Sequence, residues 1–318
     1  MGYSMENIRA VREILARRRE DAEALARLRT RELYAKNEAL RELDRRLSGT
    51  GYAVFRAAFG GGDVKANVAA LKAQNQAMQK ERCDLLAEMG LASDYTEPHY
   101  TCPACRDTGY TEKGAMCVCM KRLLVEAGIR SSGLGNLLKR QSFESFSLDY
   151  YEGEAKTYAM RVLEASREFA EDFDRTGRNL LFMGGTGLGK THLSTSIAGR
   201  VIARGFDVVY ETAQNVISDF EYDRFKSGYG ESEKRSDKYL SADLLIMDDL
   251  GAELTNQFTV ASLYNIINTR INLGKSTIIS TNLGQKALLE RYDERITSRL
   301  FGEFDPFLFR GKDIRGLK

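Results

Sequence analysis

The chain has 318 residues, of which 43% are hydrophobic and 29% carry a charge. This composition excludes an intrinsically disordered chain, and the length favours two domains. Lysine and arginine number 47 against 45 aspartate and glutamate residues, which gives a net charge of +2. So small a net charge excludes a positive field over the whole molecule, and any contact with nucleic acid therefore requires a local patch.

The sequence contains no run of about 18 uncharged apolar residues, and its N-terminal region lacks the apolar stretch of a signal peptide. We therefore expect a cytoplasmic protein with no membrane partner. Four of the five cysteines lie between Cys102 and Cys119. In a reducing compartment such a cluster favours metal binding over disulfides. The fifth, Cys83, is expected to pack on a helix.

A helical composition, rich in Ala, Leu, Arg and Glu, extends from residue 8 to about residue 91. Two breaks are predicted, at residues 48–52 and 59–63. Leucines at helical intervals form a narrow apolar stripe: Leu25, Leu28, Leu33, Leu40, Leu43 and Leu47. The stripe fits a helical hairpin packed on itself and, equally, a surface that docks a partner. We assign residues 1–97 to a helical N-terminal domain that docks a partner.

Two cysteine pairs follow this region: Cys102 with Cys105, and Cys117 with Cys119. Four thiolates can surround a Zn²⁺ ion tetrahedrally at about 2.3 Å each. The second pair has one intervening residue where two or more are usual, and His99 is the alternative fourth ligand. We predict a structural zinc-binding module at residues 98–124, with the four cysteines as ligands.

A basic, glycine-containing stretch at residues 125–142 is predicted to be a linker. Beyond it, short apolar runs alternate with helical patterns, and these runs are residues 180–183, 208–211, 244–247 and 277–280. Such alternation predicts an α/β domain at residues 143–318, with a parallel sheet and crossover helices.

The segment GGTGLGKT lies between the first apolar run and a helical segment that starts at His192. This is the context of a P-loop: the glycines let backbone N–H groups surround phosphate oxygens, and the next helix N-terminus adds positive dipole. We expect Lys190 to reach the β and γ phosphates of ATP, and the Thr191 hydroxyl to bind Mg²⁺. The predicted nucleotide-binding residues are Gly184, Gly185, Thr186, Gly187, Leu188, Gly189, Lys190, Thr191 and His192.

The apolar run at residues 244–247 ends in two carboxylates, as a Walker B strand does. Asp248 is expected to hold Mg²⁺ together with Thr191. Asp249 or Glu253 is expected to orient or deprotonate the attacking water. Asn282, two residues after the last apolar run, is predicted to sense the γ-phosphate or its water.

These motifs, with the downstream ERITSRL and DIR segments, resemble the AAA+ ATPases of the bacterial replicative helicase loader type (DnaC/DnaI). The resemblance covers residues 143–318. It implies a P-loop NTPase fold with a five-stranded parallel sheet in the order 5-1-4-3-2, and ATP bound at an interface between subunits. By motif position Arg299 resembles the arginine finger, with Arg295 as the second choice, and Arg315 resembles sensor II.

Loaders of this type hold single-stranded DNA through a helical insert after the second strand. The residues at that place are Tyr222, Arg224, Phe225 and Lys226, which offer aromatic stacking and contacts to phosphate. The alternative is that Phe225 packs against the core and Lys226 faces solvent.

The resemblance implies an ATP-dependent loader that places a hexameric replicative helicase on single-stranded DNA during replication initiation or restart. It also implies self-association through the ATPase domain and slow ATP hydrolysis stimulated by assembly or DNA. The alternative is a transposition-accessory ATPase of the IstB type, which assembles on DNA and directs a transposase. A zinc module is not part of the pattern of that family. The expected cofactors are ATP, Mg²⁺ and Zn²⁺.

Overall fold

The computed structural model describes residues 3–59, 64–173, 177–226 and 234–314. The chain divides into two compact units, one formed by Arg12–Cys119 and the other by Met1–Val11 with Met120–Lys318. Within the described residues, no helix is both long enough and apolar enough to span a membrane.

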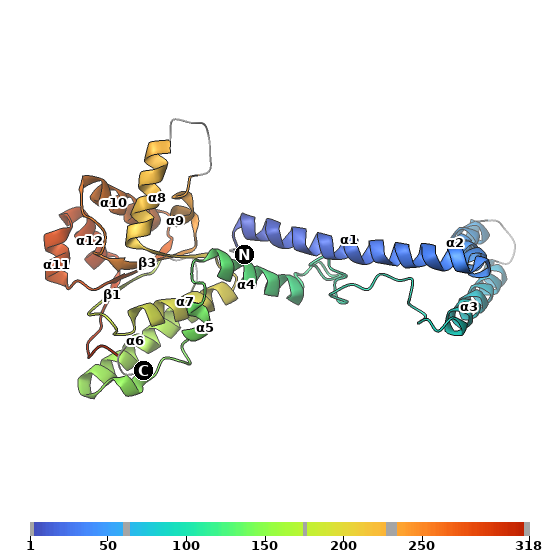
Figure 1. Cartoon of the computed structure of the whole chain (residues 1–318), viewed down its shortest axis with the longest axis horizontal. Coiled ribbons are helices and arrows are strands. Elements are labelled where there is room, and N and C mark those ends of the chain that lie inside the picture. The colour runs from blue at the N-terminus through green and yellow to red at the C-terminus, as the bar shows by residue number, and fades with distance from the viewer. Residues whose placement is uncertain (1–2, 60–63, 174–176, 227–233, 315–318) are drawn as a thin grey trace. The chain divides into compact units, whose positions relative to one another are not determined.

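The first unit contains most of helix α1 (Met5–Lys36), then α2 (Glu38–Phe59) and α3 (Val64–Glu88) (Figure 1). A break at Asn37 separates α1 from α2, and the Asn37 side chain accepts a hydrogen bond from the backbone N–H of Leu40 at 2.9 Å. The break predicted at residues 48–52 is wrong, because α2 continues through them. There the Ser48 hydroxyl donates to the carbonyl of Asp44 one turn earlier, at 2.7 Å. The second predicted break is confirmed by the end of α2 at Phe59 and the start of α3 at Val64.

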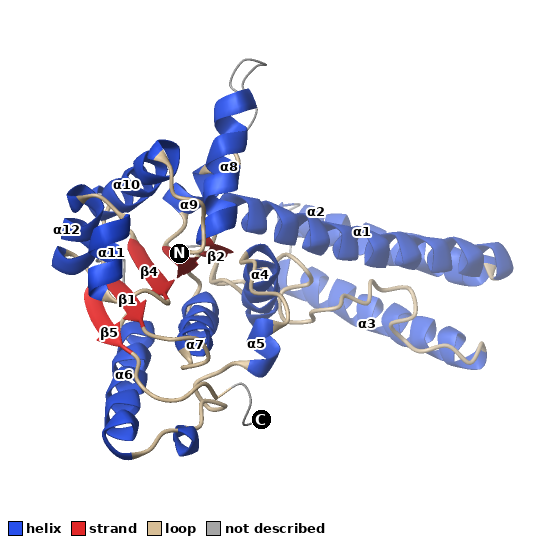
Figure 2. Ribbon diagram, turned by 60° about the vertical axis from the view of Figure 1, so that its left-hand side comes forward, coloured by secondary structure: helices blue, strands red, loops and turns tan. Residues whose placement is uncertain are grey.

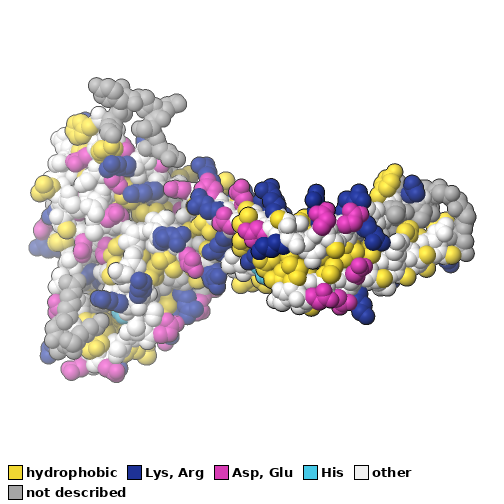
Figure 3. All heavy atoms as spheres, turned by 45° about the vertical axis from the view of Figure 1, so that its right-hand side comes forward, with side chains coloured by type: hydrophobic (Ala, Val, Ile, Leu, Met, Phe, Trp, Pro, Cys, Tyr) yellow, Lys and Arg dark blue, Asp and Glu magenta, His cyan; other side chains and the backbone are white. Residues whose placement is uncertain are grey.

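Helices α2 and α3 pack on each other through a small apolar cluster that contains Leu33, Leu40 and Leu86. A half-buried ion pair supports it, in which Arg82 Nε lies 2.7 Å from Asp44 Oδ1. The leucine stripe is therefore partly an internal hairpin contact. Figure 3 shows acidic and basic side chains interspersed along this unit, with no large area of one sign on the visible face.

Two features of the stripe and the cysteines differ from the prediction. Leu25 and Leu28 remain about half exposed, at 47% and 50%. Cys83 is exposed rather than packed, because its position on α3 lies outside the cluster around Leu86.

The second unit is built on a sheet of β1 (Asn179–Met183), β2 (Val208–Thr212), β3 (Leu244–Leu250), β4 (Ser276–Thr281) and β5 (Asp305–Leu308). The strands are all parallel and lie in the order β2-β3-β4-β1-β5. This is the order 5-1-4-3-2 implied by the resemblance, so the fold prediction is confirmed. The first four strands cover the four apolar runs of the sequence, because parallel strands buried on both faces are continuously apolar.

Helices cover both faces of this sheet (Figure 2). Successive side chains of a strand point to opposite faces, so Leu180 and Phe182 of β1 join one core and Leu181 and Met183 join the other. Helices α6 (Gly153–Glu171) and α7 (Lys190–Ala203) pack on the first face. The opposite face carries α8 (Ala213–Lys226), α9 (Asp237–Ser241), α10 (Gln257–Asn272), α11 (Gln285–Arg291) and α12 (Glu294–Gly302).

Residues 125–142 do not form the predicted linker. They carry the end of α4 (Val118–Ser131), then α5 (Leu137–Arg140), and the 3₁₀ turn η1 (Leu148–Tyr150) follows shortly after. Leu134 is fully buried in the core of the second unit. Gly128, which suggested flexibility, instead permits a close helix approach, since a Cβ there would lie 3.1 Å from Ile202. The segment is part of the folded unit because its apolar residues have a core to join.

Charged groups are buried at the end of the sheet opposite the P-loop. The Arg270 guanidinium is fully buried and donates to the carbonyls of Tyr239, Ala242 and Ser276. Nearby, the backbone N–H of Asp207 donates to the Asp243 carboxylate at 3.1 Å. Burial, and next the charge of Asp243, raises the pKa of the Asp207 carboxyl to about 6.

Candidate functional site

The P-loop connects β1 to α7, as predicted. Gly184, Gly187 and Gly189 have φ angles of +139°, +70° and +91°, which favour glycine. Space requires glycine as well, since a Cβ at Gly184 would lie 2.5 Å from the carbonyl oxygen of Phe309. The loop therefore tolerates no side chain at these positions.

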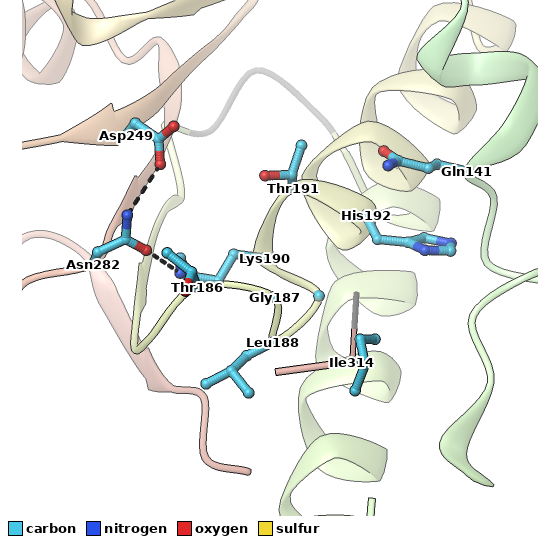
Figure 4. A pocket seen from close by; sticks show the side chains of 11 residues that line it. Gln141, Thr186, Gly187, Leu188, Lys190, Thr191, His192, Asp249, Asn282 and Ile314 are labelled. Carbon is cyan, nitrogen blue, oxygen red and sulfur yellow. Dashed lines mark hydrogen bonds between the residues drawn. The ribbon is translucent and has the colours of Figure 1, made fainter. Parts of the chain in front are cut away.

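A cavity of about 290 Å³ opens beside the loop (Figure 4). Seven of the nine predicted nucleotide-binding residues line it, namely Thr186 to His192. Gly184 and Gly185 contribute instead through their carbonyls, which accept hydrogen bonds from Lys190 Nζ at 2.6 and 2.7 Å. The remaining lining residues are Gln141, Asp249, Asn282 and Ile314.

Asn282 links the loop to the Walker B strand, as Figure 4 shows. Its Oδ1 accepts a hydrogen bond from Lys190 Nζ at 2.7 Å, and its Nδ2 donates to Asp249 Oδ1 at 3.4 Å. The three side chains come from β1–α7, β3 and β4, whose carboxyl ends meet at one edge of the sheet. The structure thus brings together the lysine, the carboxylate and the sensor that the motifs predicted.

The two predicted Mg²⁺ ligands are neighbours. Thr191 Oγ1 donates to Asp248 Oδ2 at 3.1 Å, and the Asp248 side chain is 5% exposed. A hydroxyl and a carboxylate beside the phosphate loop are the oxygen donors that Mg²⁺ takes together with substrate phosphates. The residues present therefore fit the ion.

Asp249 and Glu253 have different environments. Asp249 lies on the pocket with φ +54°, whereas Glu253 is 1% exposed and is not among the lining residues. The Glu253 carboxylate accepts hydrogen bonds from the backbone N–H of Gly251 and from the Tyr292 hydroxyl. Of the two acids left open by the sequence, the structure brings only Asp249 to the nucleotide pocket.

Two pocket residues were not predicted: Gln141, which belongs to no motif, and Ile314, which lies in the DIR segment beside the residue singled out there, Arg315. Gln141 places a buried Oε1 in this region with no hydrogen-bond partner in the described residues. Ile314 lies across the loop, and its backbone N–H donates to the Gly187 carbonyl at 3.2 Å. His192 lines the pocket as well, with its Nε2 2.9 Å from the Ser142 carbonyl oxygen and its ring edge-on against Phe146.

The candidate finger arginines lie on α12, and neither lines the pocket of its own chain. Arg299 donates to Asn268 Oδ1 from Nε and Nη2 at 3.0 and 2.8 Å, and its guanidinium lies 4.6 Å from the Tyr264 ring centroid. Arg295 is exposed. Arg315 lies outside the described residues.

The predicted DNA-binding residues lie at the end of α8. Phe225 is 83% exposed, so the alternative that it packs in the core is wrong. Arg235 covers the Tyr222 ring at 3.6 Å from its centroid, and Arg224 lies over the Phe258 ring at 5.2 Å. The side chain of Lys226 lies outside the described part of the structure.

The sulfur atoms of Cys102, Cys105, Cys117 and Cys119 all lie within 4.8 Å of one another. Four sulfurs at about 2.3 Å from one Zn²⁺ ion would lie about 3.8 Å apart, and the observed separations include 3.8 and 3.4 Å. A hydrogen bond from the backbone N–H of Cys105 lowers the pKa of Cys102 to about 7, whereas burial raises the pKa of Cys105 and of Cys119. The donor set therefore fits a closed, structural zinc site.

The short spacing of the second cysteine pair has a local explanation. Cys117 directly precedes α4 and Cys119 lies in its first turn, so the helical turn brings both sulfurs to one side. His99 does not join the cluster, because its Nε2 lies 3.2 Å from the Asp94 carbonyl. Asp107 shapes the first pair by accepting from the backbone N–H of Cys102 at 3.0 Å.

Comparison with known proteins assigns the chain to a family. The family model of the IstB-like ATP-binding proteins matches residues 131–299. The chain belongs to this family. The IstB-like match begins at the end of α4 and contains the P-loop, the Walker B strand and both candidate finger arginines, whereas the helical unit and the cysteine cluster lie before it.

Characterised relatives of this IstB-like protein include replicative helicase loaders. DnaC of Buchnera aphidicola subsp. Baizongia pistaciae is 29% identical over 182 residues, which cover 57% of this chain and 69% of that protein. DnaC of Escherichia coli K12 is 25% identical over 169 residues, covering 53% of this chain and 66% of that protein. The crystal structure of the DnaC helicase loader has a TM-score of 0.46 and 24% identity, and covers 53% of this chain and 98% of that chain.

Proposed function

We propose that this chain is an ATP-dependent loader that places a replicative helicase on single-stranded DNA. The observation that carries the proposal is the similarity to proteins named replicative helicase loader DnaC, over 57% of the chain in the first of them. The aligned part is 182 residues long. The residues proposed to bind Mg²⁺ and ATP lie together around the P-loop, which supports the proposal.

In this proposal the ATPase site is completed by a neighbouring subunit. Among the described residues that line the pocket, Lys190 is the one permanently charged cation. A hydrolytic transition state gains further charge that an arginine finger neutralises. Arg299 is held by hydrogen bonds to Asn268 and Tyr264, from where it is proposed to reach the phosphates bound by an adjacent chain. ATP then controls assembly, and hydrolysis is slow until subunits meet.

The end of α8 is the proposed contact to single-stranded DNA. Phe225 offers an exposed ring for stacking on a base, and Arg224 lies one residue away for phosphate. Asp249 is the proposed residue that orients the attacking water, since Glu253 is engaged by Tyr292.

The helical unit is the proposed docking element for the helicase, and the zinc module holds its fold. The described hairpin leaves Leu25 and Leu28 of α1 exposed, and these two leucines are available to a partner. Because four cysteines close the coordination shell, the zinc site is assigned no catalytic role.

A transposition-accessory ATPase is the second candidate, and the match to the IstB-like family model favours it. The helicase reading is preferred because the curated relatives bear the loader name, and because the helical unit and cysteine cluster precede the matched region.

Size-exclusion chromatography of the full chain with the replicative helicase of the same organism, with and without ATP, tests the proposal. A stable complex at micromolar concentration is expected. Absence of a complex in both conditions would reject the loader reading and favour the transposition reading, for which binding to duplex DNA and a transposase is the corresponding assay.

A further inference from the structure

Four donors surround the carboxylate of Asp248. The hydroxyls of Thr191 and Tyr210 both donate to Oδ2. The hydroxyl of Ser280 and the backbone N–H of Asp249 donate to Oδ1. Thr191 and Asp248 were predicted from the motifs, but Tyr210 comes from β2 and has no motif around it.

Tyr210 is itself fixed in place from two sides. Its strand pairs with β3 in a register that sets Tyr210 against Ile246 and Thr212 against Asp248. On the other edge its backbone N–H donates to the Ser132 carbonyl at 2.7 Å. Gly133 allows this approach, since a Cβ there would lie 2.4 Å from the Tyr210 carbonyl oxygen. The α4–α5 turn therefore holds the strand from which the hydroxyl reaches Asp248.

A simpler explanation of the bond from Tyr210 to Asp248 is that a partly buried hydroxyl requires an acceptor and takes whichever one lies near. The same unit contains such a case, because the Tyr239 hydroxyl donates to Asp219 at 2.6 Å, on the α8–α9 side of the sheet. Tyr210 differs in its acceptor, which is the carboxylate that also bonds Thr191 at the phosphate loop.

We propose that Tyr210 is a positioning residue that fixes the orientation of the Asp248 carboxylate toward Mg²⁺, so that metal affinity depends on the tyrosine hydroxyl. The inference rests on the proposed use of this pocket for Mg²⁺ and ATP. A carboxylate that accepts bonds from Tyr210 and Ser280 cannot rotate freely. The Oδ2 position that now accepts from Thr191 therefore stays on the Thr191 side, where an ion bound by the Thr191 hydroxyl would replace that hydrogen bond. Partners of this kind typically change metal affinity 10- to 100-fold when removed.

Tyr210→Phe removes the hydroxyl and keeps the ring. The assay is equilibrium binding of a fluorescent, non-hydrolysable ATP analogue to the full chain, with Mg²⁺ titrated from zero to saturation. We expect the half-saturating Mg²⁺ concentration to rise about 10-fold or more, with analogue affinity in the absence of Mg²⁺ unchanged. Tyr239→Phe is the matched control, because it removes the same kind of bond away from the pocket, and it should leave the Mg²⁺ titration unchanged.

An unchanged or lower half-saturating Mg²⁺ concentration in Tyr210→Phe would overturn the inference. So would an equal shift in Tyr239→Phe, which would show a general loss of structure. No helicase is present, so failure of the chain to bind a helicase leaves this test intact. If the unaltered chain binds the analogue without any Mg²⁺ dependence, the proposed ATP site and this inference both fail.

Discussion

Replacing Lys190 by alanine tests the phosphate site directly. Without nucleotide, the three donors of the ammonium are all in use, on the carbonyls of Gly184 and Gly185 and on Asn282 Oδ1. ATP binding therefore exchanges bonds to neutral oxygens for bonds to phosphate. Lys190→Ala therefore costs the difference in free energy between the two sets of hydrogen bonds, and not the full free energy of the bonds to phosphate.

The size of the effect follows from these exchanged bonds. Hydrogen bonds to charged groups contribute about 1.5–3 kcal/mol, with anionic acceptors at the upper end and neutral ones at the lower end. Lys190 is expected to exchange two of its three bonds, one for the β phosphate and one for the γ phosphate. The two exchanges together contribute about 3 kcal/mol to the free energy of ATP binding, so their loss corresponds to a roughly 150-fold loss of ATP affinity. Isothermal titration calorimetry with Mg²⁺ and ATP measures it.

The control is Lys286→Ala on α11, where the lysine side chain is 92% exposed and is not a lining residue. Its ATP affinity should equal that of the unaltered chain. Thermal unfolding without nucleotide separates lost folding from lost binding. A folded Lys190→Ala variant that binds ATP within threefold of the unaltered chain would refute the assignment of Lys190 to the phosphates.

Three further predictions concern the other sites. Arg299→Ala should lower the assembly-stimulated rate of ATP hydrolysis by about 10³-fold or more and leave ATP affinity intact, whereas Arg295→Ala should retain most of the rate; the reverse result would make Arg295 the finger. Cys105→Ser should lose the one zinc ion expected per chain, measured by native mass spectrometry, and a full zinc content in the variant would contradict the four-cysteine site. The pKa of Asp207 is raised to about 6 in the folded chain, so the folded state binds the Asp207 proton more tightly than the unfolded state does. Proton binding at Asp207 therefore contributes fully to the free energy of unfolding below pH 4, and this contribution is lost as the pH rises through 6. Asp207→Asn should remove that pH dependence of thermal unfolding and stabilise the unit at pH 7 by about 1–2 kcal/mol after allowance for partial exposure; an unchanged pH profile would show that Asp207 titrates normally.

The sequence predicted the sheet well because its signal is local. Each central strand contains an apolar run buried on both faces, as residues 244–247 of β3 show. The P-loop signal is equally local, since the three glycines with positive φ angles, Gly184, Gly187 and Gly189, lie within one short segment. The four cysteines were also predictable, because thiols clustered within one short segment have few other uses in a reducing environment.

The errors came from residues whose role depends on distant partners. Residues 125–142 looked like a linker, yet Leu134 is buried because the ATPase core receives it. The break predicted at residues 48–52 is a different case, because α2 passes through them and the Ser48 hydroxyl makes a local bond to the Asp44 carbonyl one turn earlier. The composition of a segment indicates which conformations it can adopt, whereas its contacts in the folded chain determine which one it does adopt.

The same limit applied within the site. Asp249 and Glu253 are both carboxylates in the sequence, and the structure separates them: Asp249 lines the pocket, whereas Glu253 is buried and accepts bonds from Gly251 and Tyr292. Tyr210 carries no motif, because its contact with Asp248 depends on the pairing of β2 with β3. A residue such as Tyr210, whose partner lies on a neighbouring strand, can be identified only once the order and register of the strands are known.

Deposition of a helicase on DNA tests the proposed function most directly. The measurement is the amount of the replicative helicase of the same organism that remains on closed circular single-stranded DNA after free protein is removed, in the presence of ATP. Retention should rise strongly with the unaltered chain and return to the level of helicase alone with Lys190→Ala. Equal retention with and without the chain, or full retention with Lys190→Ala, would contradict an ATP-controlled loader.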